Sequence, residues 1–178
     1  SQPDVDAIAD KMAQILNRAT SSTPLITIED ITVIHNPSKD DMQHYLTQFE
    51  IILKSSFSSI TPEKKIMNSI TDTFNEYRDT KSLPSVDTLA KWLSGCDQFL
   101  TDIKILHVPK DFVSLHIEYI NAMTKEREAL TKIHSIKNDM ALAVVGLKEF
   151  TNAIAQFYVL GKKYQQLASE KNLILTYR

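Results

Sequence analysis

The sequence predicts an all-α protein, a single-domain bundle of about six helices that ends in a long antiparallel helix pair. Three observations predict this fold. Apolar residues recur three and four positions apart through most of the chain, as on one face of a helix. Glycine, which sheet-rich folds need in their turns, occurs only three times in 178 residues. Residues 108–178 hold two long helical patterns separated by one short turn.

The second of these long patterns is apolar on almost every side. Between Met140 and Leu160 only Lys148 and Glu149 are charged. A helix with one face in water normally has a polar face opposite its apolar stripe. We therefore expect this helix to be the central one, covered on several sides by the rest of the chain or by a partner.

The N-terminal part is expected to hold one helix and one extended segment. Residues 1–20 form the first helix, with acidic residues at its positive end. Residues 21–36 form an extended tether across the bundle, because the stretch 25–36 is rich in β-branched side chains. A short hairpin near Glu29-Asp30 would fit this segment, since no other part of the chain offers a good strand.

Residues 37–106 are expected to hold three helices, each with a recognisable start. Ser38 can cap the first of them, with Asp41 at the third helical position. Thr61-Pro62-Glu63 places a capping hydroxyl, a proline and an acid at the start of the next. Ser85 caps the last of the three.

Residues 108–178 are expected to form the helical hairpin. His107-Val108-Pro109 indicates a tight corner, because proline cannot continue a helix but can begin one. The fifth helix then runs to about Lys137, and the sixth runs from its cap Asp139 to about Leu175. So short a turn requires the two helices to lie antiparallel.

Two further expectations concern packing within this bundle. Gly95, Gly146 and Gly161 are expected to mark places where helices approach each other closely. Phe150 and Phe157 are expected on the buried side of the sixth helix, where loss of either ring would be costly.

Charge and hydropathy exclude two classes of interaction. The net charge is −2 and no run of Lys or Arg exceeds two residues, whereas a nucleic-acid surface needs clustered cations. No stretch reaches the roughly 18 uncharged apolar residues of a membrane span. The chain begins at Ser1 without methionine, which fits either removal of that methionine or a soluble part whose membrane anchor lay upstream.

Histidine and cysteine offer candidate sites, and each has a structural alternative. Asp41 and His44 have the spacing of a helical metal pair, but two ligands are too few for a metal. His116 is either a proton-sensing or ligand-binding residue or a buried histidine bonded to a polar neighbour, and we favour burial, as for Asn121. Cys96 has no local base to activate it, so packing is its expected role.

The sequence contains no nucleotide-binding loop, nucleophile elbow or zinc-protease motif. We therefore assign no catalytic, cofactor-binding or metal-binding residue and expect no cofactor. On this basis the chain is expected not to be an enzyme.

Two stretches resemble a known family. The first is residues 28–36, which lead into a helix carrying Tyr45, Phe49 and Leu53. The second comprises Val108-Pro109, Leu115-His116-Ile117, Ile120-Asn121, Asn138-Asp139, Gly146-Leu147 and Phe150. Together they resemble uncharacterised helical proteins of the candidate-phyla bacteria (Patescibacteria and their relatives), which often have proline where this chain has Met140. The resemblance implies an envelope protein with an N-terminal hydrophobic anchor and a helical soluble part, and it implies no activity.

Two functions from different classes remain open. The first is a non-enzymatic helical interaction or scaffold module that binds a protein partner. It would be the soluble extracytoplasmic part of a cell-envelope protein, for example of a pilus or secretion apparatus, although a cytoplasmic location stays open. The alternative is a ligand-sensing bundle that holds a small molecule between its helices, with His116, Trp92 and Tyr119 lining the pocket. A large exposed apolar patch would favour the first, and a ligand cavity the second.

Overall fold

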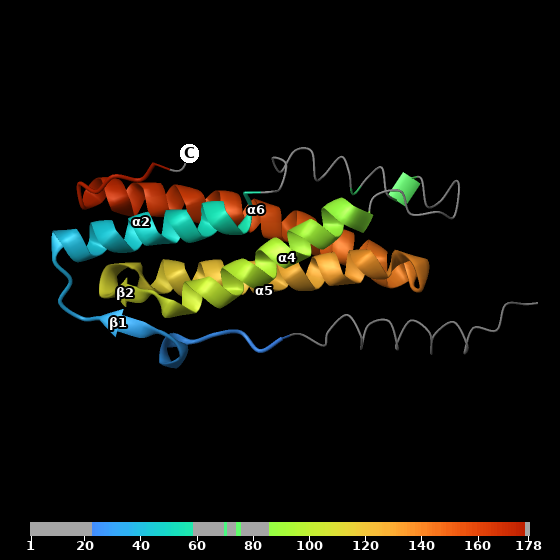
Figure 1. The fold of residues 1–178 in the computed structure, drawn as a ribbon, viewed down its shortest axis with the longest axis horizontal. Coiled ribbons are helices and arrows are strands. Elements are labelled where there is room, and N and C mark those ends of the chain that lie inside the picture. The colour runs from blue at the N-terminus through green and yellow to red at the C-terminus, as the bar shows by residue number, and fades with distance from the viewer. Residues whose placement is uncertain (1–22, 59–69, 71–73, 76–85, 177–178) are drawn as a thin grey trace, which may run out of the picture.

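The computed structural model describes residues 23–58, 70, 74–75 and 86–176. This part of the chain is dominated by four α-helices (Figure 1), namely α2 (Lys39–Ser56), α4 (Val86–Asp102), α5 (Val113–His134) and α6 (Met140–Glu170). It also holds two three-residue strands, β1 (Thr32–Ile34) and β2 (His107–Pro109). Single 3₁₀ turns occupy Ile28–Asp30, Ile103–Ile105, Lys110–Phe112 and Ser135–Lys137. The all-α class is confirmed, while the expected first helix and the start of the third lie outside the described residues.

Helices α5 and α6 lie side by side (Figure 1). Ion pairs join Glu118 to Lys163 at 2.9 Å and Lys132 to Glu149 at 2.7 Å. Residues later in α5 therefore meet residues earlier in α6. The backbones are closest at Gly146, where a Cβ would lie 2.6 Å from the carbonyl oxygen of Ala129 and 2.7 Å from Cβ of Lys132. Only glycine allows this approach without a shift of the backbone.

The expectation that α6 is the central, surrounded helix is wrong for the described structure. Its buried residues form one stripe, consisting of Ala143, Gly146, Phe150, Ala153, Leu160, Tyr164 and Ala168. Elsewhere on the helix Val144, Tyr158 and Val159 are 52%, 68% and 51% exposed. An apolar sequence does not demand burial, because more than half of a folded protein's accessible surface is apolar.

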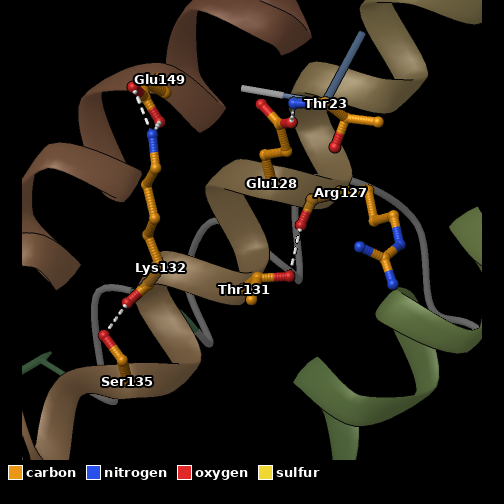
Figure 2. Close-up of polar contacts among 7 residues, drawn as sticks. All are labelled: Thr23, Arg127, Glu128, Thr131, Lys132, Ser135 and Glu149. Atoms are coloured by element: carbon orange, nitrogen blue, oxygen red, sulfur yellow. Dashed lines mark hydrogen bonds and ion pairs between the residues drawn. The ribbon is translucent and has the colours of Figure 1, made fainter. Parts of the chain in front are cut away.

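Among the described elements, helix α5, not α6, contacts the most neighbours. The side chains drawn in Figure 2 show this arrangement: the Glu128 carboxylate accepts a hydrogen bond from the backbone N–H of Thr23, in the N-terminal segment. Arg127 extends toward α4, where it forms an ion pair with Asp97. Lys132 donates to both carboxylate oxygens of Glu149 on α6, at 2.8 and 2.7 Å. Three separate segments are thus fixed to α5 within two helical turns.

The extended tether is present, but it pairs differently from the expected hairpin. Strand β1 pairs with β2 in parallel, with Val33 opposite Val108. His107–Pro109 is therefore a strand and not a corner that opens the fifth helix, which instead begins at Val113 after a 3₁₀ turn. The Asn121 side chain holds the tether further back, accepting from the N–H of Ile26 at 2.9 Å and donating to its carbonyl at 3.1 Å.

The helix ends show which of the predicted capping residues and helix boundaries are correct. The Ser38 hydroxyl accepts a hydrogen bond from the N–H of Asp41 at 3.1 Å, and Asp139 accepts one from the N–H of Leu142 at 2.9 Å. Both predicted caps are confirmed. Helix α6 ends at Glu170 rather than near residue 175, because Asn172 adopts φ 53°, the left-handed conformation that terminates helices.

Two of the three glycines lie at close contacts and the third does not. A Cβ at Gly95 would lie 2.8 Å from the Phe57 ring, so the expected close approach is confirmed there, as it is at Gly146. At Gly161 the expectation is wrong, because a Cβ would meet no atom within 4 Å. The space beside Gly161 belongs to the cleft described below.

This contrast gives a matched pair of variants on one helix. Gly146→Ala should lower the free energy of unfolding by about 1–3 kcal/mol, because the added methyl group overlaps the α5 backbone. Gly161→Ala should raise it by up to about 1 kcal/mol, since alanine favours the helix and nothing obstructs it. Urea denaturation measures both, and equal effects of the two substitutions would contradict the described helix contact.

Candidate functional site

The candidate site is a cleft of about 1020 Å³ between α2 and α6. This volume lies at the upper end of the range for small-molecule sites, about 300–1000 Å³. The α2 side is formed mainly by Phe49, Leu53 and Phe57. The α6 side is formed mainly by Ile154, Phe157, Tyr158, Val159 and Tyr164. Helices α4 and α5 contribute Trp92, Tyr119, Met123 and Glu126.

The cleft exists because α2 packs on α4 and β2 rather than closely on α6. Two small residues on the α6 side, Ala155 and Gly161, leave further room. The aromatic residues that face this space hold one another in place. Phe49 stacks on Tyr164 with ring centroids 5.1 Å apart and forms a T-shaped pair with Tyr119 with centroids 5.0 Å apart. Such aromatic contacts are worth about 0.5–1.5 kcal/mol each beyond the burial of area.

Trp92 and Glu126 form a buried polar pair at the site. The indole Nε1 of Trp92 donates to a carboxylate oxygen of Glu126 at 2.7 Å, and Glu126 is only 1% exposed. The Trp92 ring also packs against Phe57, with centroids 4.9 Å apart. The pair therefore links α4 to α5 and fixes the orientation of the tryptophan that lines the cleft.

A second buried polar group lies behind the aromatic wall. The hydroxyl of Tyr45 is 3.0 Å from Nδ1 of His116 and 2.9 Å from the hydroxyl of Tyr164. Burial lowers the pKa of His116 to about 4, so the imidazole is neutral near pH 7. Burial also raises the pKa of Tyr45 and of Tyr164, which keeps both hydroxyls protonated. The group is a neutral hydrogen-bonded link between α2, α5 and α6.

Charged side chains also line the cleft. Glu50 and Lys54 come from α2, and Lys162 comes from α6. Glu50 accepts a hydrogen bond from the hydroxyl of Thr176. The Lys162 ammonium lies 4.9 Å from the centre of the Tyr158 ring, a cation–π contact. Among the residues that the structure describes, neither Lys54 nor Lys162 forms an ion pair.

The residues singled out from the sequence fall into four groups. Trp92 and Tyr119 line the cleft, as the ligand-binding alternative predicted. His116 does not line it, and its burial with a polar partner is confirmed, as is the polar pairing of Asn121. Cys96 is fully buried, and burial together with the Glu126 and Asp97 carboxylates raises the pKa of its thiol, which suits packing.

The remaining candidate is the Asp41 and His44 pair. Both residues are exposed, and the Asp41 carboxylate is hydrogen-bonded to Ser38 as part of the helix cap, which lowers its pKa. Within residues 23–58, 70, 74–75 and 86–176 there is no group of three or more His, Cys, Asp or Glu side chains able to hold a metal ion.

Several cleft residues were not identified from the sequence as site residues. Phe49 and Phe157 were expected only as members of helical apolar stripes, and Tyr158, Lys54 and Lys162 were not singled out. The one available signal was Gly161, a glycine within an apolar helix, which was assigned to close packing. A glycine marks either a contact or a space, and the sequence does not distinguish them.

Comparison with protein families, curated proteins and solved structures finds no match to this chain. Within the part of the chain that the structure describes, no helix is both long enough and apolar enough to cross a bilayer.

The lowered pKa of His116 predicts a pH dependence of stability. The unfolded chain takes up this proton near pH 6.5 and the folded chain only near pH 4, so its contribution to stability is complete above pH 6.5 and is lost as the pH falls toward 4. The loss is up to about 3 kcal/mol. His116→Gln should remove this part of the slope in urea titrations, and an NMR titration of the wild type showing a His116 pKa above 6 would contradict the assignment.

The two phenylalanines of α6 should differ in their contribution to stability. Phe150 is fully buried, so Phe150→Ala should cost about 3–5 kcal/mol of unfolding free energy. Phe157 is half-buried and faces the cleft, so Phe157→Ala should cost clearly less, about 1–2 kcal/mol. Urea denaturation of both variants tests this order, and an equal or reversed order would mean that the cleft is closed in solution.

Proposed function

We propose that this chain is a non-enzymatic helical binding module that holds an apolar guest in the cleft between α2 and α6. The observation that carries the proposal is the cleft itself, a space of about 1020 Å³ lined largely by aromatic and aliphatic side chains. Sites of this size and lining, with a few polar groups, are typical of small-molecule binding. Lining such a space with apolar residues is unfavourable in water unless something occupies it.

The lining residues support this proposal because contacts with neighbouring side chains fix their orientation. Trp92 is fixed by Glu126, and Tyr164 is fixed by Tyr45 and by stacking on Phe49. A pre-shaped site loses little conformational entropy when a guest binds. The buried titratable groups near the cleft do not change their charge near pH 7, because the Cys96 thiol stays protonated and the His116 imidazole stays neutral. Their fixed protonation supports binding rather than catalysis.

A second candidate function is a scaffold that binds a protein partner, and the exposed apolar residues of α6 favour it. Val144 is more than half exposed and does not line the cleft, and Tyr158 and Val159, which do line it, are also more than half exposed. An extracytoplasmic place in the cell envelope belongs to the same proposal, and its support is the resemblance to the candidate-phyla family. We also propose about six helices for the whole chain, with α5 and α6 as the long antiparallel pair that carries the site.

Binding of an apolar guest can be tested by blocking the cleft. A neutral dye such as Nile red should gain fluorescence with the wild type, and Gly161→Leu should reduce the gain by filling the space beside Gly161. Val144→Leu is the matched control, because it introduces the same residue on the exposed side of the same helix. Circular dichroism should show all three proteins folded.

Equal dye binding by wild type and Gly161→Leu would place the dye elsewhere on the surface and would overturn the proposed function. Loss of binding in Val144→Leu, with Gly161→Leu unaffected, would instead favour the exposed face of α6 as the apolar interaction surface.

A further inference from the structure

We propose that residues 174–176 form a strap that gates the cleft between α2 and α6, and that a guest enters and leaves when this strap detaches from α2. The inference rests on the proposed function, since it concerns access to the same cleft. Three observations carry it: the fixed base of the strap, its attachment to α2 through side chains, and the position of Leu175 at the cleft.

The base of the strap is held by backbone and side-chain contacts. Asn172, with φ 53°, reverses the chain after α6, and Figure 1 shows the next residues turning back along the bundle. The N–H of Leu173 donates to the carbonyl oxygen of Ala168 at 2.8 Å, and the Leu173 side chain belongs to the core. Lys171 pairs at 2.6 Å with Asp111, in the 3₁₀ turn before α5. The strap therefore starts from a fixed point.

The strap itself is attached through two side chains of α2. The Gln43 amide accepts from the N–H of Ile174 at 2.8 Å and donates to the carbonyl oxygen of Ile174 at 2.9 Å. The hydroxyl of Thr176 donates to the carboxylate of Glu50. Among the described residues, the strap makes no backbone–backbone hydrogen bond. Because a hydrogen bond changes an equilibrium by only about two- to tenfold, the strap can detach while the helices stay folded.

Leu175 places the strap at the cleft. Its side chain is half-buried and lines the cleft, whereas Ile174 beside it is 70% exposed. Glu50, which holds Thr176, also lines the cleft. Both the covering side chain and one of its two attachment points are therefore part of the lining, so detachment of the strap uncovers part of the cleft.

The attached strap is compatible with a bound guest. The cleft volume of about 1020 Å³ is the space that remains with Leu175 in place. The strap therefore closes one side of the site rather than filling it. If a guest passes only while the strap is detached, entry and release are slowed by the same factor, and the affinity is unchanged.

Gln43→Ala tests the gate because it removes both hydrogen bonds to Ile174. Stopped-flow fluorescence of Nile red with the full chain should show association and dissociation rates each raised at least about fivefold, with Kd changed less than about twofold. Gln48→Ala is the matched control and should leave both rates unchanged. Gln48 is half-buried on the same helix and, among the described residues, neither lines the cleft nor bonds to the strap.

Attachment of the strap also has a readout that needs no guest. Hydrogen exchange of the Ile174 amide, followed by NMR, should be at least about fivefold faster in Gln43→Ala than in the wild type or Gln48→Ala, because this amide donates to Gln43. The Leu173 amide, which is bonded to Ala168 in the fixed base, should keep its protection in all three proteins and so show that the fold is intact.

The outcomes distinguish this inference from the proposed function. Gly161-dependent binding of Nile red at rates that Gln43→Ala leaves unchanged would overturn the gate while the apolar guest stands. Faster association with a correspondingly tighter Kd would make Leu175 a plug that competes with the guest, and would also overturn the gate. Equal exchange of the Ile174 amide in wild type and Gln43→Ala would contradict the attachment itself. Absence of Gly161-dependent binding would overturn the proposed function, and the gate with it, whatever the exchange rates.

Discussion

The structure depends on the close contact between α5 and α6 at Gly146. There the two backbones approach so closely that a Cβ would lie 2.6 Å from a carbonyl oxygen of α5. Further along, Glu118 pairs with Lys163 and Asp111 with Lys171. Because one side of α6 is thus fixed against α5, its neighbouring side is left to face α2.

The position of α2 then determines whether a cleft forms. Helix α2 rests on α4 and β2, and its Tyr45 is hydrogen-bonded to both His116 of α5 and Tyr164 of α6. This link joins α2 to α5 and α6 through side chains rather than by close backbone packing. The space beyond it is bordered by aromatic rings on the α2 side and by the small residues Ala155 and Gly161 on the α6 side. The cleft therefore results from the packing of α2 on α4 and β2 and from the small residues on the facing side of α6.

Helix α5 occupies the most connected position although its sequence is the more polar of the long pair. Its buried polar side chains each have a partner: Glu126 accepts from Trp92, His116 is bonded to Tyr45, and Thr124 donates to the carbonyl of Ile120. A buried polar group is costly only when it lacks a partner. The partners of Glu126 and His116 come from other helices, so α5 is polar in sequence and buried in space.

These features explain how far the sequence predicts the structure. The caps at Ser38 and Asp139 were predictable, because a capping side chain and its N–H are three residues apart. The pairing of β1 with β2 was not, because it joins segments far apart in the chain through short strands of ordinary composition. The apolar residues around α6 suggested a central helix, but Val144 and Val159 are each more than half exposed. Of the site, Trp92 and Tyr119 were anticipated as lining residues, whereas the cleft itself depends on how far apart two helices lie, which no local pattern encodes.

The central claim is that the cleft between α2 and α6 holds an apolar guest. A crystal structure of the complex with a neutral brominated apolar molecule, with bromine located by its anomalous signal, tests this most directly. The account predicts bromine between the two helices, in contact with Trp92 and Met123. Bromine on the outer side of α6 beside Val144, with α2 and α6 closed on each other, would contradict it.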